Sequence, residues 1–219
     1  MSEFNDAVTA ALSDIVEIAR SYDFEWALVG GLALQSYGVP RHTLDVDAFV
    51  AEDNILQFAD ALILDAGWLP LVYSVDSGDY VETSEATLHY MDDPVLFDVG
   101  QQRVMIPLST KDGLPVELIA AQHPVEVEMM ERSVIRRHYG IRIPIAPLGG
   151  ILLVKTKADR LKDKAAIEQV AEHLSGSTLQ SAIAWAEERD PATAEDLRSI
   201  ISVARIRRNP VSIKKRSSS

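Results

Sequence analysis

The segment 26–50 constrains the fold of this 219-residue chain more than any other part of its sequence. An apolar run ends at Gly30 and Gly31, and a second apolar run follows in which Asp45 and Asp47 alternate with hydrophobic residues. Side chains at positions i and i+2 of a β-strand point to the same face of a sheet. The segment therefore predicts a strand, a glycine turn, a short helix and a second strand, with both carboxylates converging on one point beside that turn.

Acidic residues are depleted in strands, so two of them in an apolar strand need a reason. Two acids next to a glycine turn fit a divalent cation that holds a nucleoside triphosphate. Gly30 and Gly31 lie where a strand gives way to a helix, and free backbone N–H groups at such a place bind phosphate. Arg41 and Thr43 precede the acids and supply a cation and a hydroxyl, although Arg41 could equally clamp Asp45. Solvated surface acids are the alternative for the acidic pair.

A site for two metal ions needs a third carboxylate, because two acids cannot fill the coordination of two magnesium ions about 3.5–4 Å apart. Glu117 and Asp98 are candidates, since each is flanked by apolar residues on a short predicted strand. A surface acid on a half-buried strand is the alternative for either residue. The residues alone leave the third ligand open between the two.

Composition places the chain among ordinary globular proteins: 47% of its residues are hydrophobic and 25% are charged. No apolar run approaches the roughly 18 residues that a membrane span needs. The N-terminal residues lack the pattern of a signal peptide. The absence of cysteine excludes disulfides and thiolate metal sites. These features predict a cytoplasmic protein with no membrane partner.

The net charge of −12 is unevenly distributed, because six basic residues and no acids lie from Arg205 to the end of the chain. The acidic remainder argues against broad, non-specific binding of nucleic acid, which depends on neutralising phosphates. A nucleotide brought in as a magnesium complex, or a local basic channel, is compatible with it. A basic cluster either lines an RNA or nucleotide cleft or forms an ordinary exposed strand edge; its members are Arg132, Arg136, Arg137, His138 and Arg142.

Hydrophobic periodicity predicts a mixed α/β fold, with a largely antiparallel sheet flanked by helices and a C-terminal helical bundle. Strands are expected at 24–29, 44–50, 69–74, 86–91, 95–99, 102–107, 115–121 and 141–145. Helices are expected at 5–21, 31–37, 54–66, 124–131, 148–158, 163–174, 178–188 and 192–207. Asp163 is expected to cap the helix that it begins. Three regions follow: 1–146, a helical region 147–208 and a disordered basic tail 209–219.

Taken together, these motifs resemble the nucleotidyltransferases of the DNA polymerase β superfamily, and more narrowly the bacterial stand-alone group that includes the AbiEii-type toxins. The motifs are Gly30-Gly31, Arg41-His42-Thr43, Asp45-Val46-Asp47 and Val116-Glu117-Leu118-Ile119. A weaker match is a helix with Lys155, followed by Arg160-Leu161-Lys162-Asp163. The chain departs from the common pattern in having Glu117 rather than Asp, and Gly31 where serine often follows the first glycine. The resemblance favours Glu117 over Asp98.

The resemblance implies that region 1–146 is a magnesium-dependent nucleotidyltransferase domain, which moves NMP from an NTP such as ATP to a hydroxyl of RNA (tRNA), protein or a small molecule. It implies that two Mg²⁺ ions, replaceable by Mn²⁺, are held by Asp45, Asp47 and Glu117. It implies nucleotide-binding roles that fall on Gly30, Gly31, Arg41, Thr43 and Lys155. It also implies a toxin role with an antitoxin protein as partner. A catalytically inactive nucleotide-binding or protein-interaction module on the same fold is the alternative.

Overall fold

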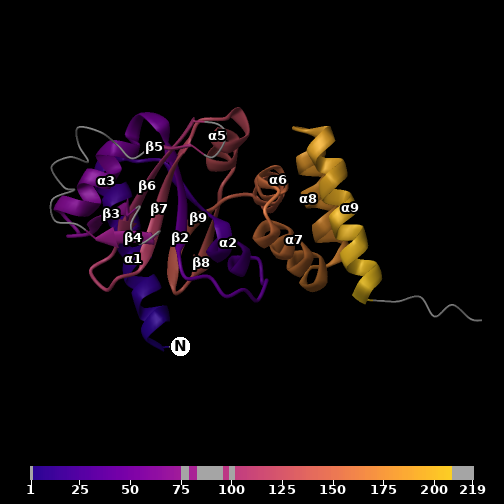
Figure 1. The fold of residues 1–219 in the computed structure, drawn as a ribbon, viewed down its shortest axis with the longest axis horizontal. Helices are drawn as coiled ribbons and strands as arrows, with labels where there is room; N and C mark the ends of the chain where they lie inside the picture. The colour runs from indigo at the N-terminus through magenta and orange to yellow at the C-terminus, as the bar shows by residue number, and fades with distance from the viewer. Residues whose placement is uncertain (1, 75–78, 83–95, 99–101, 209–219) are drawn as a thin grey trace, which may run out of the picture. The chain divides into compact units, whose positions relative to one another are not determined.

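The structure is a computed structural model and describes residues 2–74, 79–82, 96–98 and 102–208. The chain divides into two compact units (Figure 1). Met1–Tyr37 with Arg41–Pro147 form the sheet unit, and Gly38–Pro40 with Leu148–Ser219 form the helical unit. The predicted fold class, a mixed α/β fold with a largely antiparallel sheet followed by C-terminal helices, is confirmed.

The sheet unit is built on strands from widely separated parts of the chain. Its strands are β1 (Trp26–Val29), β2 (Val46–Ala51), β3 (Leu69–Ser74), β4 (Asp79–Glu82), β5 (Leu96–Asp98), β6 (Gln102–Ser109), β7 (Pro115–Ala121), β8 (Val134–His138) and β9 (Ile141–Ile145). Within the described residues they pair in the order β4-β3-β6-β7-β2-β1-β9-β8, and β5 pairs with β6. The pairs β2–β7 and β1–β9 are parallel, and the other pairs are antiparallel.

Helices pack onto this sheet because each presents an apolar stripe to it. They are α1 (Ser2–Tyr22), α2 (Gly30–Ser36), α3 (Ile55–Leu64) and α5 (Pro124–Glu131), with a short 3-10 turn η1 (Glu52–Asn54) before α3. Helix α1 contacts α3 and β9, whereas α5 contacts β1, β2 and β7. Trp68, which is 1% exposed, donates its indole N–H to Asp14 of α1 at 2.9 Å and so ties that helix to the entry of β3.

The two central strands differ in burial between their faces. Val46 and Ala48 of β2 are 0% exposed and lie beside buried residues of β7. Asp47 alternates with them and points to the other face, where Glu117 occupies the paired position on β7; both acids are half-buried. We call these two sides of the sheet the Ala48 face and the Asp47 face.

Several strands differ from the expectation, either in their bounds or because they were not expected. The strand expected over 44–50 begins at Val46, so Asp45 lies in the bend before β2 and the alternation argument does not reach it. Strands β4 and β8 were not expected. In β8, three of the five residues are charged or ionisable, so the strand shows no clear alternation. The strand expected over 86–91 lies outside the described residues.

The helical unit packs α6 (Leu148–Ala158), α7 (Leu161–His173), α8 (Gly176–Glu187) and α9 (Pro191–Arg208) around an apolar core. Gly149 allows the close approach of α6 to α8, because a Cβ there would lie 2.6 Å from the carbonyl oxygen of Ala182. The predicted capping role of Asp163 is wrong: α7 begins earlier, its N-cap is Arg160, and Asp163 lies within the first turn. Among the described residues, none of the helices is both long and apolar enough to cross a membrane.

Candidate functional site

The turn between β1 and α2 is shaped by two close approaches of side chains to glycine. Gly30 has a φ of +67°, in the region that favours glycine, and a Cβ at this position would overlap Oδ2 of Asp47. A Cβ on Gly31 would lie 2.5 Å from Oγ1 of Thr43. Both glycines are therefore required so that the side chains of Asp47 and Thr43 can lie directly against the backbone of this turn.

Asp47 lies at the centre of three neighbouring strands. It pairs with Val29 of β1 on one side and with Glu117 of β7 on the other. Adjacent strands are about 4.8 Å apart, and paired residues project to the same face, so the two carboxylates are direct neighbours. Neither Asp47 nor Glu117 is without a partner in the folded protein. The sheet thus brings together two of the four acids that the sequence singled out.

Asp98, the alternative third acid, belongs to a different part of the sheet. Asp98 is the last residue of β5, and its backbone pairs with that of Gln102 in β6. Strands β6 and β7 intervene between β5 and β2 in the pairing order. The structure therefore brings Glu117, and not the backbone of Asp98, beside Asp47.

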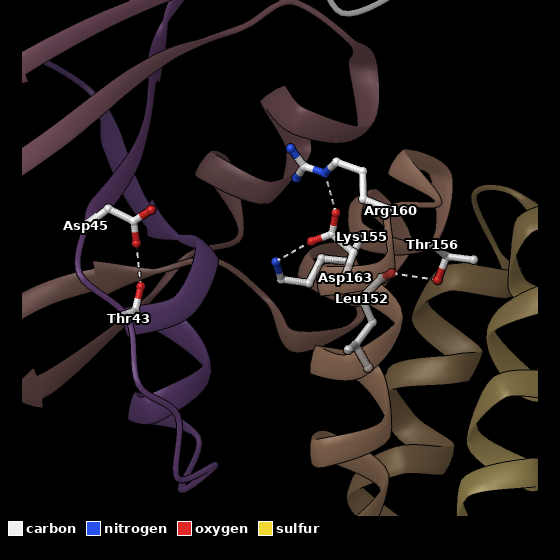
Figure 2. Close-up of polar contacts among 7 residues, drawn as sticks. All are labelled: Thr43, Asp45, Leu152, Lys155, Thr156, Arg160 and Asp163. Atoms are coloured by element: carbon white, nitrogen blue, oxygen red, sulfur yellow. Dashed lines mark hydrogen bonds and ion pairs between the residues drawn. The ribbon is translucent and has the colours of Figure 1, made fainter. Parts of the chain in front are cut away.

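Thr43 and Asp45 form a local pair on the segment that leads into β2. Thr43 is 9% exposed, and its hydroxyl donates to Oδ1 of Asp45, as Figure 2 shows. Asp45 itself is half-buried. The hydroxyl expected to touch a phosphate oxygen or fix the loop is thus engaged with the first carboxylate, and it leaves Oδ2 of Asp45 outside this bond.

Gln35 holds the same segment from the side of α2, and sequence analysis missed it. Its side-chain amide donates to the backbone carbonyl of Arg41 at 2.7 Å, and its Oε1 accepts from the hydroxyl of Tyr139 at 3.1 Å. Arg41 is half-buried and has at least one further partner in the protein. In the sequence, Gln35 stands out only as an amide side chain that directly follows the apolar stretch Gly31–Leu34.

The donor atoms at this site are carboxylate oxygens, which are the ligands that Mg²⁺ prefers. Among the described residues, however, no group of three or more His, Asp or Glu side chains is gathered so as to hold a metal ion. Asp47 and Glu117 are adjacent, whereas one oxygen of Asp45 is bound to Thr43. The residue types therefore fit the ion, and the arrangement shown here is that of two neighbouring acids with a third held next to them.

Lys155 lies in the helical unit, where it is part of a buried ion cluster. Its Nζ is 2.9 Å from Oδ1 of Asp163, and Nε of Arg160 is 2.6 Å from the other carboxylate oxygen (Figure 2). The side chain of Asp163 is 1% exposed and that of Lys155 is 14% exposed. Burial raises the pKa of Asp163, but the hydrogen bonds and charges of Arg160 and Lys155 outweigh it and hold that pKa below its ordinary value.

No protein-family model and no curated protein matches this chain. Solved structures that resemble it include a candidate nucleotidyltransferase from Thermotoga maritima, at 14% identity and a TM-score of 0.48, over 73% of this chain and 89% of that one. The antibiotic-resistance factor ANT(2″)-Ia matches at 12% identity and 0.46, over 93% and 95%. An antigenic nucleotidyltransferase-like protein from Paracoccidioides brasiliensis matches at 16% and 0.46, over 92% and 93%. Likenesses of this size define no family, so the function must be argued from the site.

Substituting Gly30 should show how closely Asp47 packs on the turn. Gly30→Ala combines an unfavourable positive φ with an overlap on the Asp47 carboxylate, and should lower the free energy of unfolding by about 2–4 kcal/mol. Urea unfolding measures this. Gly113→Ala is the matched control, because its φ is +77° and nothing lies within 4 Å of the added methyl group. Equal losses in both variants would show that backbone strain alone, and not contact with Asp47, explains the effect.

Substituting Asp163 tests the buried cluster. Asp163→Asn leaves the largely buried Lys155 ammonium without its counter-charge, and should cost about 3 kcal/mol of stability. Since the pKa of Asp163 is lowered in the fold, its stabilisation is present above about pH 4 and is lost as the pH falls through the folded pKa. Chemical denaturation between pH 3 and pH 7 should thus show a flatter profile for the variant. Asp159→Asn, which breaks an exposed pair with Lys164, should change neither quantity appreciably.

Proposed function

We propose that the sheet unit is a magnesium-dependent nucleotidyltransferase, which transfers NMP from an NTP to an acceptor hydroxyl and releases pyrophosphate. The observation that carries the proposal is the parallel pairing of Asp47 with Glu117 beside the Gly30 turn. Three motifs that are distant in sequence meet there: the glycine turn, the acid pair of 45–47 and the acid of β7. A purely structural sheet has no need of two adjacent half-buried carboxylates, since like charges placed side by side destabilise it.

In this proposal, Asp47 and Glu117 would hold the metal ions, and Asp45 would join them once its Oδ1 is released from the hydroxyl of Thr43. Bound Mg²⁺, or Mn²⁺ in its place, would neutralise the triphosphate and lower the pKa of the attacking hydroxyl. Thr43 would then be free to donate to a phosphate oxygen, and Gly31 leaves room for the Thr43 side chain because it carries no Cβ. This sequence of contacts explains why a buried hydroxyl lies next to the acids.

The remaining nucleotide-binding roles are also proposals. Gly31 packs against Thr43 and Arg41 lies two residues before it; the first would contact the phosphates from the turn and the second from the loop. Lys155 would neutralise the β- and γ-phosphates, but its ammonium already lies 2.9 Å from Asp163, so phosphate would compete with that ion pair. We therefore expect a smaller effect from Lys155 than from the acids.

The alternative is a nucleotide-binding or protein-interaction module that does not catalyse transfer. It is favoured by one observation: the part of the chain that the structure describes holds no ready group of three metal ligands. Calorimetry with ATP, GTP, CTP and UTP in the presence of Mg²⁺, followed by assay of pyrophosphate, separates the two functions. Binding of a nucleotide without pyrophosphate release, over a panel of RNA, protein and small-molecule acceptors, would favour the module.

The biological role that we propose is that of a toxin whose activity is controlled by an antitoxin protein. The support for it is the motif resemblance alone, and the acceptor is proposed to be RNA, with protein or a small molecule as alternatives. A toxin is expected to arrest growth when expression of the wild-type chain is induced, and the variant Asp47→Asn should relieve that arrest.

Asp47→Asn and Glu117→Gln should each lower transfer of label from [α-³²P]NTP by at least about 100-fold, because each removes a charged ligand while keeping the shape of the side chain. Melting temperatures should stay within a few degrees of wild type. Asp53→Asn, which changes an exposed acid in η1, serves as the charge-matched control and should retain full activity. Undiminished labelling by Asp47→Asn would contradict the metal assignment. Binding of Mn²⁺, followed by electron paramagnetic resonance, gives a readout that is independent of the acceptor.

A further inference from the structure

The hairpin of β8 and β9 ends the sheet and is unusually basic for this acidic protein. Strand β8 is the last in the pairing order and forms an edge of the sheet. The segment 132–147 contains four arginines and no aspartate or glutamate, in a chain of net charge −12. The turn at its tip consists of Tyr139 and Gly140, both with positive φ, as a two-residue hairpin requires.

Two of these arginines face each other directly. Arg137 pairs with Arg142 across the hairpin, and both side chains are exposed. Side chains in paired positions have Cβ atoms about 5 Å apart, and like charges there are destabilising. Neither arginine forms an ion pair within the described residues, whereas Arg132, Arg160, Arg189, Arg198 and Arg207 each do. Within the described residues, no acidic side chain therefore compensates the two positive charges of Arg137 and Arg142, and an anion from outside could do so.

The arginine pair lies on the same side of the sheet as the candidate site. The residue pairs that link the strands are Asp47–Val29, Leu28–Ile145 and Arg142–Arg137. Because side chains alternate along each strand, Arg137 and Arg142 project from the Asp47 face. Three strand spacings, roughly 14 Å, separate β2 from β8 across the sheet, and the register offsets Arg142 from the level of Asp47 by roughly 13 Å along the strands. An anion that reaches both places must be longer than a single triphosphate.

The other side of the hairpin holds this pair in place. The guanidinium of Arg136 stacks on the ring of Tyr37 at 4.3 Å from its centroid, and Tyr139 donates to Gln35. Gln35 in turn binds the carbonyl of Arg41, which begins the segment that leads to Asp45. The side chain of Gln35 thus connects the hairpin to the loop that leads to Asp45. These contacts hold the backbone of the hairpin, which carries the exposed arginines, in place.

We propose that the β8–β9 hairpin binds the phosphodiester backbone of a single-stranded nucleic acid. The planar guanidinium groups of Arg137 and Arg142 match phosphate oxygens, and repeated phosphates can compensate both charges at once. Ile135, which is 53% exposed on the same face, offers an apolar surface to an unstacked base. A duplex would bring many more phosphates against the acidic body, which favours the narrower single strand. The idea that the bound nucleic acid supplies the acceptor hydroxyl rests on the proposed function. Binding of the nucleic acid to the hairpin does not depend on that function.

The test is fluorescence anisotropy with a fluorescein-labelled 12-nucleotide oligouridylate, titrated with the full chain at 50 to 200 mM NaCl. Arg137→Ala/Arg142→Ala should weaken binding at least about tenfold and reduce the slope of log K against log salt by about 1.4, since each single-strand phosphate contact contributes about 0.7. Arg198→Ala/Arg207→Ala removes the same charge from ion-paired arginines and should bind like wild type. Arg137→Lys/Arg142→Lys should keep the salt slope, because point charges remain.

Three kinds of result would overturn the proposal. The first is failure of the wild-type chain to bind the oligonucleotide at 50 mM NaCl, or equal losses in the hairpin and control variants. The second is self-association of the alanine variant with unchanged binding, which would show that the arginines guard the sheet edge. The third is binding of polyglutamate in preference to the oligonucleotide, which would indicate an acidic protein partner. Each variant is also assayed with Asp47→Asn added: binding that survives this change while transfer is lost separates the hairpin from the proposed catalysis.

Discussion

The packing of the Asp47 carboxylate against the bare backbone of Gly30 is the contact on which the rest of the sheet unit depends. It requires a residue without a Cβ at a positive φ, a strand that places Asp47 beside β1, and a neighbour on β7 that leaves room on the same face. Thr43 uses Gly31 in the same manner. Because the carboxylate of Asp47 lies directly against the backbone of Gly30, the glycine turn and this acid cannot move independently of each other.

Sequence patterns predicted most of this fold, because its elements are strongly periodic. Strands β3, β7 and β9 and helices α5 and α6 have the predicted bounds. The parallel pairing that places Glu117 next to Asp47 was not predicted, since the register between distant strands depends on contacts that no local pattern encodes. The edge strand β8 was missed because its arginines hide the alternation on which strand prediction relies.

The candidate site was foreseen in its residue types and only partly in its arrangement. The acids, the glycines and Thr43 were chosen because their chemistry suits a metal-bound nucleotide, and the structure places them around one turn. It did not follow from the sequence that Thr43 engages Asp45, that Gln35 fixes the loop at Arg41, or that Asp163 is buried between Lys155 and Arg160. These are side-chain contacts between residues whose spacing in sequence allows many other partners.

The parallel strands β2 and β7 are joined by everything between Ala51 and Pro115, and their register places the two acids side by side. Strand β6 of this connection pairs with β7 from Met105 to Ser109 and buries Ile106 and Leu108, so it supports the strand that carries Glu117. The side of the acid pair that faces away from the glycine turn therefore depends on a strand that carries none of the candidate site residues.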